Sequence, residues 1–159
     1  MVLLLLIPVA LITAFGLAGY GFGVLGRLGV RGAGRVVWLR CLGSLLGAGA
    51  VAVYTWGLLL AAGAVLEAED GGASSSPLLP CRTPGQWERA SQVIDYRVDY
   101  VPLRFVCETT GGGSFATDAV PGYVNQAVVG FALGAVVCAG AAAVTGEMAE
   151  RRAGRVSGG

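Results

Sequence analysis

The residues with the richest potential chemistry in this 159-residue chain are its four cysteines, because it contains no histidine and all its positive charges are arginines. Histidine and lysine are the usual bases and thiolate-activating groups near neutral pH, and histidine is also a common zinc and haem ligand. We therefore predict no catalytic residue, no metal site and no cofactor, and we expect that the protein is not an enzyme. The four thiols are those of Cys41, Cys81, Cys107 and Cys138.

Cys81 and Cys107 lie in the single long polar interval of the chain, 26 residues apart. If that interval faces an oxidising compartment, a disulfide between them would persist and would contribute about 3–4 kcal/mol to stability. We predict a structural Cys81–Cys107 disulfide. A redox-active pair is the alternative, but such cysteines are usually close neighbours with a cation nearby. Cys41 and Cys138 lie in apolar runs and are expected to act as small apolar residues.

Three uncharged apolar runs make up most of the remaining chain, which is 55% hydrophobic, only 13% charged and has a mean hydropathy of +0.69. Each run exceeds the length of about 18 residues at which a membrane-spanning helix is expected. We predict transmembrane helices at residues 1–26, 41–66 and 123–146, and hence an all-α membrane protein. A cleaved signal peptide is the alternative for the first run, but no positive side chain precedes it and it is too long.

The arginines predict the orientation of these helices. Arg27, Arg31, Arg35 and Arg40 separate the first two runs without any acid, and the tail after the third run contains three more arginines. The interval 67–122 contains four arginines and eight acids, for a net charge of −4. Because cytoplasmic loops collect positive charge, we place the Arg-rich turn 27–40 and the tail 147–159 in the cytoplasm. The N-terminus and the segment 67–122 are then extracytoplasmic.

The arginines of the turn recur every four residues from Arg27 to Arg35, a spacing that would stack them on one helix face. We interpret them, together with Arg40, as topogenic residues that also reach the lipid headgroups. A specific binding stripe for anionic lipids is the alternative. Trp38 and Tyr123 are predicted to be interfacial aromatic residues.

The predicted spans contain no ionisable side chain of the kind that transporters and channels place within the bilayer. Their hydroxyl groups are expected to bond to the backbone of their own helix. Each run also contains a pair of glycines four residues apart. Such pairs are no more frequent in the chain than chance predicts for 27 glycines in 159 residues. We expect these glycine faces to pack, because glycine lets helix backbones approach closely. The hydroxyl residues are Thr13, Ser44, Tyr54 and Thr55, and the pairs are Gly19/Gly23, Gly43/Gly47 and Gly130/Gly134.

Within the polar interval, residues 67–80 predict a flexible tether, because they are acidic and then rich in glycine and serine. Apolar residues then alternate with charged ones from Ile94 to Tyr100, which is typical of a strand. The apolar face changes phase after Pro102, which predicts a bulge or bend in an edge strand. A glycine turn at 111–113 and a second strand at 115–120 complete a predicted short β-hairpin, which the disulfide would stabilise.

The sequences YVPLRFVC at 100–107 and VPGYVN at 120–125 resemble those of uncharacterised small integral membrane proteins of high-G+C Gram-positive bacteria. The resemblance covers roughly the last third of the chain and implies no activity. The exclusive use of arginine and the abundance of alanine, glycine, valine and leucine are also typical of such genomes. We therefore predict a multi-pass protein of a bacterial cell membrane.

These observations predict an accessory or interaction subunit that acts through its extracytoplasmic segment. Its expected partners are membrane lipids and either another membrane protein or further copies of itself. A net charge of +1 excludes a nucleic-acid partner. The alternative is a membrane thiol–disulfide exchange protein that uses Cys81 and Cys107.

Overall fold

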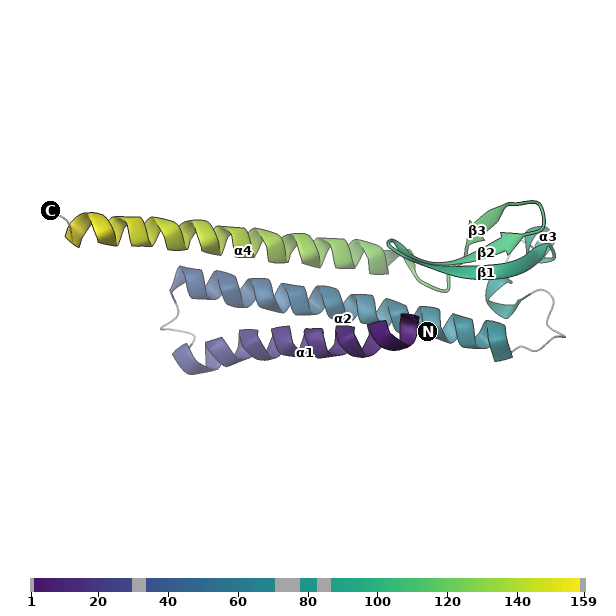
Figure 1. Ribbon diagram of the computed structural model, residues 1–159, viewed down its shortest axis with the longest axis horizontal. Helices are drawn as coiled ribbons and strands as arrows, with labels where there is room; N and C mark the ends of the chain where they lie inside the picture. Colours follow the sequence, from purple (N-terminus) through teal and green to yellow (C-terminus); the bar gives the residue numbers. More distant parts are fainter. Residues whose placement is uncertain (1, 30–33, 71–77, 83–86, 158–159) are drawn as a thin grey trace. The chain divides into compact units, whose positions relative to one another are not determined.

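The computed structural model describes residues 2–29, 34–70, 78–82 and 87–157 (Figure 1). The described chain contains three long helices: α1 (Val2–Leu28), α2 (Arg35–Asp70) and α4 (Gly122–Ser157). A small antiparallel sheet lies between α2 and α4 in the sequence. Its strands are β1 (Val93–Tyr100), β2 (Leu103–Thr109) and β3 (Ser114–Ala116), in the order β1-β2-β3. A 3₁₀ turn, η1 (Leu79–Cys81), and one short helical turn, α3 (Trp87–Ala90), precede the sheet.

The predicted combination of three long apolar helices with a small disulfide-linked β-segment is confirmed. Within the described residues, all three helices are long and apolar enough to cross a membrane. The chain divides into two compact units. The sheet unit contains Met1–Ile7 and Val53–Gln126, and the helical unit contains Pro8–Ala52 and Ala127–Gly159.

In the helical unit, α2 packs antiparallel against both α1 and α4 through glycines. A Cβ at Gly47 would lie 3.5 Å from Leu17 of α1, and a Cβ at Gly43 would lie 3.3 Å from the Cβ of Cys138 in α4. The expected packing of glycine pairs is therefore correct for Gly43/Gly47. It is wrong for Gly19 and Gly23, where a Cβ would meet nothing within 4 Å. In the third pair, a Cβ at Gly134 would lie 3.1 Å from Leu46 of α2, whereas a Cβ at Gly130 would meet nothing within 4 Å.

The predicted stacking of the turn arginines on one helix is wrong. Helix α1 ends at Leu28 because Gly29 adopts the left-handed conformation, with φ +68°, and its N–H donates to the carbonyl of Leu25 at 3.0 Å. Helix α2 begins only at Arg35, so Arg27 and Arg35 lie on different helices. Arg31 lies outside the described residues.

The phase change at Pro102 is a chain reversal, and the predicted bulge in one strand at that point is wrong. Tyr100 pairs with Leu103, so Val101 and Pro102 form the two-residue turn of a tight hairpin between β1 and β2. An irregularity occurs instead between Val93 and Asp95, where the register shifts. Ile94 was predicted to lie on the apolar face. It lies at this irregularity and its side chain is 64% exposed.

The predicted second strand at 115–120 is shorter than expected. Strand β3 pairs with β2 only from Ser114 to Ala116, and one further bond joins the N–H of Thr117 to the carbonyl of Phe105 at 3.0 Å. The chain then turns into α4, whose first residue, Gly122, follows Pro121. The sheet accordingly has three strands instead of the two of a simple hairpin.

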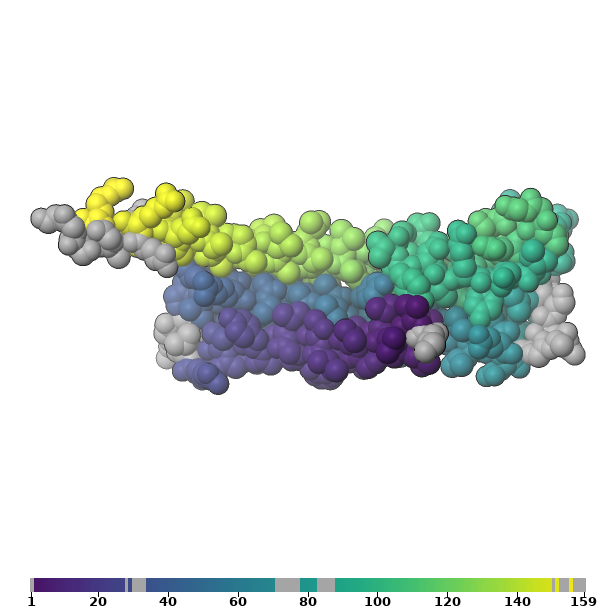
Figure 2. All heavy atoms as spheres, in the orientation of Figure 1, coloured from purple at the N-terminus to yellow at the C-terminus, as the bar shows by residue number. Residues whose placement is uncertain are grey.

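The predicted tether is wrong at both of its ends. Helix α2 continues through Asp70, and Ala68 is buried against the sheet together with Ala64 one turn earlier. Leu78 also packs on this cluster, so the described chain resumes before Cys81. Residues 71–77 of the predicted tether lie outside the described residues. In the space-filling view, the green sheet segment lies directly against the teal atoms of the last turns of α2 (Figure 2).

The start of β2 packs closely against α2. Leu103 and Val124 are both 0% exposed, and a Cβ at Gly57 would lie 2.7 Å from Leu103 and 2.8 Å from Val124. Leu58 and Ala61 of α2 and Val120 complete this buried cluster, and Leu3, Leu6 and Ile7 of α1 pack against it. Glycine is therefore the residue that fits at position 57.

We predict that Gly57→Ala destabilises the protein by about 1–3 kcal/mol, because the added methyl group overfills a fully buried cluster. The matched control is Gly63→Ala on the same helix, where a Cβ meets nothing within 4 Å. This control should be neutral or should stabilise by about 0.5–1 kcal/mol, because alanine is the better helix former. Thermal unfolding in detergent micelles measures both. Equal effects of the two variants would contradict the close approach at Gly57.

Candidate functional site

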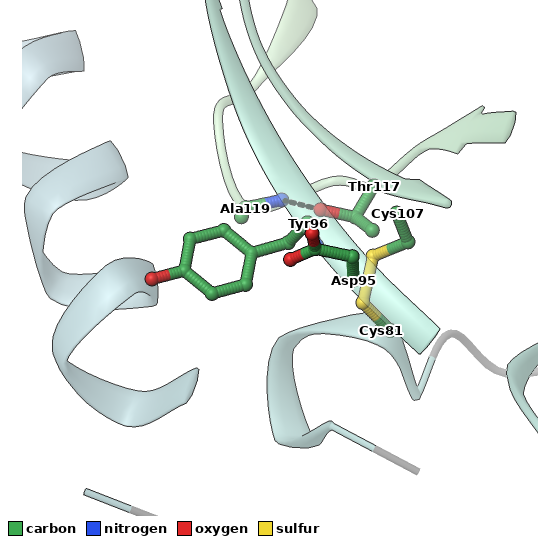
Figure 3. The surroundings of a disulfide bond; sticks show 6 residues. All are labelled: Cys81, Asp95, Tyr96, Cys107, Thr117 and Ala119. Atoms are coloured by element: carbon green, nitrogen blue, oxygen red, sulfur yellow. Dashed lines mark hydrogen bonds between the residues drawn. A yellow bond between two sulfur atoms is a disulfide. The ribbon is translucent and has the colours of Figure 1, made fainter. Parts of the chain in front are cut away.

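The disulfide lies within the segment between α2 and α4, next to Tyr96 and Thr117 (Figure 3). Cys81 and Cys107 are bonded, with their Cα atoms 6.1 Å apart, and both residues are 0% exposed. They share a buried cluster with Phe105 and with the alanines of α2. The predicted bridge is therefore present, and it links η1 to β2. Protein atoms cover both sulfurs.

The other two cysteines are free, as predicted. Cys41 is buried and Cys138 is half-buried. In residues 2–29, 34–70, 78–82 and 87–157, no group of three or more cysteines and carboxylates is placed to share a metal ion.

Tyr96 connects the sheet to the last turn of α2. Its ring stacks on Phe105 at a centroid distance of 5.2 Å, and its hydroxyl group donates to a carboxylate oxygen of Glu69 at 3.0 Å. Partial burial raises the pKa of Tyr96, and the hydrogen bond to Glu69 and the negative charges of Glu69 and Asp95 raise it further. The phenol therefore stays protonated at physiological pH and remains a hydrogen-bond donor to Glu69.

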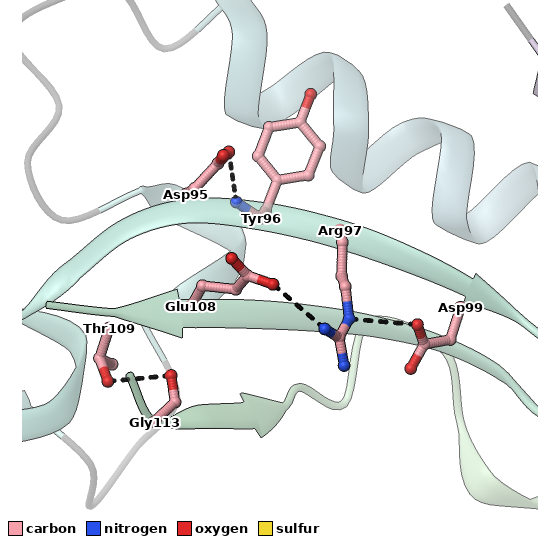
Figure 4. A network of polar contacts seen from close by, with 7 residues as sticks. All are labelled: Asp95, Tyr96, Arg97, Asp99, Glu108, Thr109 and Gly113. Atoms are coloured by element: carbon pink, nitrogen blue, oxygen red, sulfur yellow. Dashed lines mark hydrogen bonds and ion pairs between the residues drawn. The ribbon is translucent and has the colours of Figure 1, made fainter. Parts of the chain in front are cut away.

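The opposite face of the sheet carries an exposed ionic cluster (Figure 4). The guanidinium of Arg97 forms ion pairs with Asp99 and Glu108, both at 3.2 Å. Beside them lies a pocket of about 340 Å³ between β1, β2 and the glycine turn, next to the bond from the Thr109 hydroxyl to the Gly113 carbonyl at 3.0 Å. Exposed ion pairs contribute about 0–1 kcal/mol each, so these contacts add little to the stability of the sheet.

Asn125 holds the backbone of the hairpin tip. Its side-chain oxygen accepts a hydrogen bond from the Leu103 N–H at 2.9 Å, and its side-chain amide donates to the Leu103 carbonyl at 3.0 Å. The backbone N–H and C=O groups of alternate residues in a strand point to the same edge. In β2, those of Leu103, Phe105 and Cys107 point to the edge that pairs with β3. β3 ends before it reaches Leu103, and the amide of Asn125 takes the place of a further strand residue.

Tyr54 secures the other strand of the same hairpin. Its hydroxyl group donates to the backbone carbonyl of Tyr100 at 3.0 Å. The expectation that this hydroxyl bonds within its own helix is therefore wrong, because a phenol extends too far from the helix axis to do so. The expectation is correct for Thr13, which donates to Val9 at 2.8 Å, and for Ser44, which donates to Cys41 at 2.9 Å.

Sequence reasoning did not identify Asn125 and Gly57 as the residues that dock the hairpin. Asn125 is the sole asparagine of the chain and stands just inside an apolar run. That position was a usable signal, because an amide at the end of a span needs partners. Gly57 gave no such signal among 27 glycines.

A groove of about 440 Å³ lies beside the disulfide-linked segment in the sheet unit. Its lining is mainly apolar and includes three charged residues from three parts of the chain. The lining residues come from α2, from the segment around η1 and from the segment before α4. The lining residues are Leu59, Leu60, Gly63, Ala64, Glu67, Pro80, Arg82, Asp118 and Ala119.

The predicted topogenic arginines within the described chain are all exposed. Arg27 lies in the last turn of α1, and Arg35 is the first residue of α2. Arg40 lines a second groove of about 500 Å³ within the helical unit, which is otherwise formed mainly by small and apolar residues of the three helices. The structure thus brings Arg40 together with apolar surface and does not stack it with the other arginines.

Comparison of the chain with profiles of protein families, with curated proteins and with solved structures gives no match.

We predict that Asn125→Ala destabilises the protein by about 1–3 kcal/mol, because it leaves the Leu103 backbone groups without partners in a buried position. Gln126→Ala, at the exposed neighbouring position, is the control and should have little effect. Hydrogen exchange at the Leu103 amide reports the loss locally. Unchanged protection of this amide in Asn125→Ala would contradict the role assigned to Asn125.

We predict that the bridge resists reduction until the protein unfolds, because neither sulfur is accessible to an attacking thiolate. A maleimide mass tag added under denaturing conditions without reductant should modify two cysteines, Cys41 and Cys138. Prior treatment of the folded protein with a glutathione buffer should leave this number at two, and reduction during denaturation should raise it to four, the number of cysteines in the chain. Four tags after mild treatment of the folded protein would show that the bridge is exposed to exchange.

Proposed function

We propose that this chain is a small integral membrane protein that acts as an accessory subunit, and that its disulfide-linked segment contacts a protein partner outside the cytoplasm. The three helices that are long and apolar enough would all cross the membrane. A spanning helix is suited to lipid because its backbone N–H and C=O groups are hydrogen-bonded within the helix itself.

The positions of the arginines support an orientation with the disulfide-linked segment outside. Arg27 ends α1, Arg35 begins α2, and Arg155 lies in the last turn of α4. In an antiparallel arrangement these three helix ends face the same side, and the positive-inside rule assigns that side to the cytoplasm. The acids Glu67, Glu69 and Asp70 end α2 at the opposite side.

The groove beside α2 is the observation on which the proposed partner contact rests. Its lining includes Leu59, which is 46% exposed, and Gly63, which leaves open space above the helix. Glu67 and Asp118 are among its charged lining residues. A mainly apolar lining with a few charged residues fits a segment of another membrane protein that presents apolar side chains, because such a contact removes apolar surface from water.

The alternative, a thiol–disulfide exchange protein, is less well supported by the geometry. Exchange requires a thiolate to reach one sulfur in line with the S–S bond, and both cysteines are completely buried. The bridge also lies in an apolar cluster with Phe105 and the alanines of α2, where a thiolate would be poorly solvated.

We predict that a photoreactive benzophenone amino acid at Leu59 yields one discrete cross-linked protein species in native membranes. Gly63→Leu should abolish this species, because its side chain fills the groove without disturbing the fold. Gly111→Leu, at an open position in the sheet turn, should leave it unchanged. A species of twice the mass would identify a second copy of the chain as the partner. Cross-links to lipid alone, or a species that survives Gly63→Leu, would contradict the proposal.

A further inference from the structure

The turn between β1 and β2 is apolar and protrudes from the fold. Val101 is 91% exposed, and Pro102 beside it is also exposed. Two-residue hairpin turns usually carry glycine, asparagine or aspartate, which water solvates well. Here a β-branched residue and a proline occupy the turn, and both are exposed.

The tip lies at the level where two of the long helices begin. Leu103, the first residue after the turn, is packed with Val124 near the start of α4 and with Leu58 of α2. Leu3, Leu6 and Ile7 from the first turns of α1 pack on the same cluster. The ends of two candidate spans therefore define a plane that passes through Leu58 and the hairpin tip.

Helix length places a membrane boundary at the same level. The 36 residues of α2 would extend over about 54 Å, far more than the hydrocarbon core of about 30 Å. The segment from Arg35 to Trp56 alone would extend over about 33 Å. Beyond it, Ala61, Ala64 and Ala68 are buried against the sheet segment, so this part of α2 has a protein covering of its own.

Exposed aromatic residues mark the same plane. Trp56 is 54% exposed and precedes Gly57, and Tyr123 is 60% exposed and precedes Val124. Tryptophan and tyrosine are enriched at the membrane–water interface.

The backbone groups on both sides of the turn have partners within the protein. Non-helical backbone enters lipid at low cost only where its polar groups have partners in the protein. The Tyr100 carbonyl accepts from Tyr54, both backbone groups of Leu103 are bonded to Asn125, and Pro102 has no N–H.

We propose that the Val101–Pro102 turn is embedded in the outer leaflet of the membrane, at the boundary between headgroups and acyl chains and in the plane of Trp56 and Tyr123. The turn thereby adds a third type of membrane contact to the helices and the arginines, and it fixes the height of the sheet above the bilayer. This inference rests on the membrane insertion proposed above.

Site-directed spin labelling tests the proposal. Single labels are introduced as Val101→Cys, Ile94→Cys and Val136→Cys in the full chain carrying Cys41→Ser and Cys138→Ser, reconstituted in vesicles of phosphatidylethanolamine and phosphatidylglycerol. Ile94 is the matched control, because it is also exposed and apolar but lies at the far end of β1. Val136 is 68% exposed in the middle of α4 and reports insertion of that helix.

The ratio of collision rates with oxygen and with a water-soluble nickel complex reports depth. We expect a ratio at Val101 several-fold above that at Ile94 and below that at Val136. Equal ratios at Val101 and Ile94, with a high ratio at Val136, would overturn the embedded turn and leave membrane insertion intact. A low ratio at Val136 would overturn insertion itself and with it this inference. An intact bridge in each labelled variant, shown by the absence of new tags without reductant, confirms that the fold is retained.

Discussion

The packing of Leu103 against Gly57 is the contact on which the arrangement of the sheet unit depends. A hairpin alone is marginally stable in water, so it must bury one face against something else. Here the start of β2 reaches the surface of α2 at a position without a side chain, and Val124 closes the contact from α4. Asn125 and Tyr54 provide the polar complement, because they satisfy backbone groups that this docking removes from water. Apolar fit and backbone hydrogen bonding thus meet at one point.

The disulfide completes the attachment farther along the same helix. Cys81 follows the end of α2 in the sequence. Cys107 lies two residues after Phe105 on β2, the strand whose first residue is Leu103. Small residues on α2 make this second contact possible, since Ala64 and Ala68 are buried under the bridge and Phe105. Tyr96 adds a hydrogen bond to Glu69 on the last turn. The sheet is therefore held at two places along one helix, which gives the accessory segment that we propose a rigid support.

Much of this architecture follows from the sequence, because it depends on local or compositional signals. Apolar runs predicted the three helices, and the isolation of Cys81 and Cys107 in the polar interval predicted their bridge. Contacts between distant residues were the features that escaped. Pro102 changes the phase of the apolar pattern whether it forms a bulge or a turn, and only the pairing of Tyr100 with Leu103 distinguishes them. The roles of Gly57 and Asn125 likewise depend on which residue lies opposite. The position of Asn125 at the end of an apolar run indicates that it needs partners, but the sequence does not say which partners these are.

A double-mutant cycle between Gly57→Ala and Leu103→Ala tests the central contact most directly. Leu103→Ala alone should cost about 2–5 kcal/mol, because it removes a fully buried side chain. It also removes one of the two side chains that an alanine at position 57 would strike. The penalty of Gly57→Ala should therefore be smaller in the Leu103→Ala background, with a coupling energy of about 1–2 kcal/mol. Additivity of the two substitutions within about 0.5 kcal/mol would contradict the account, because it would show that the two positions do not contact each other.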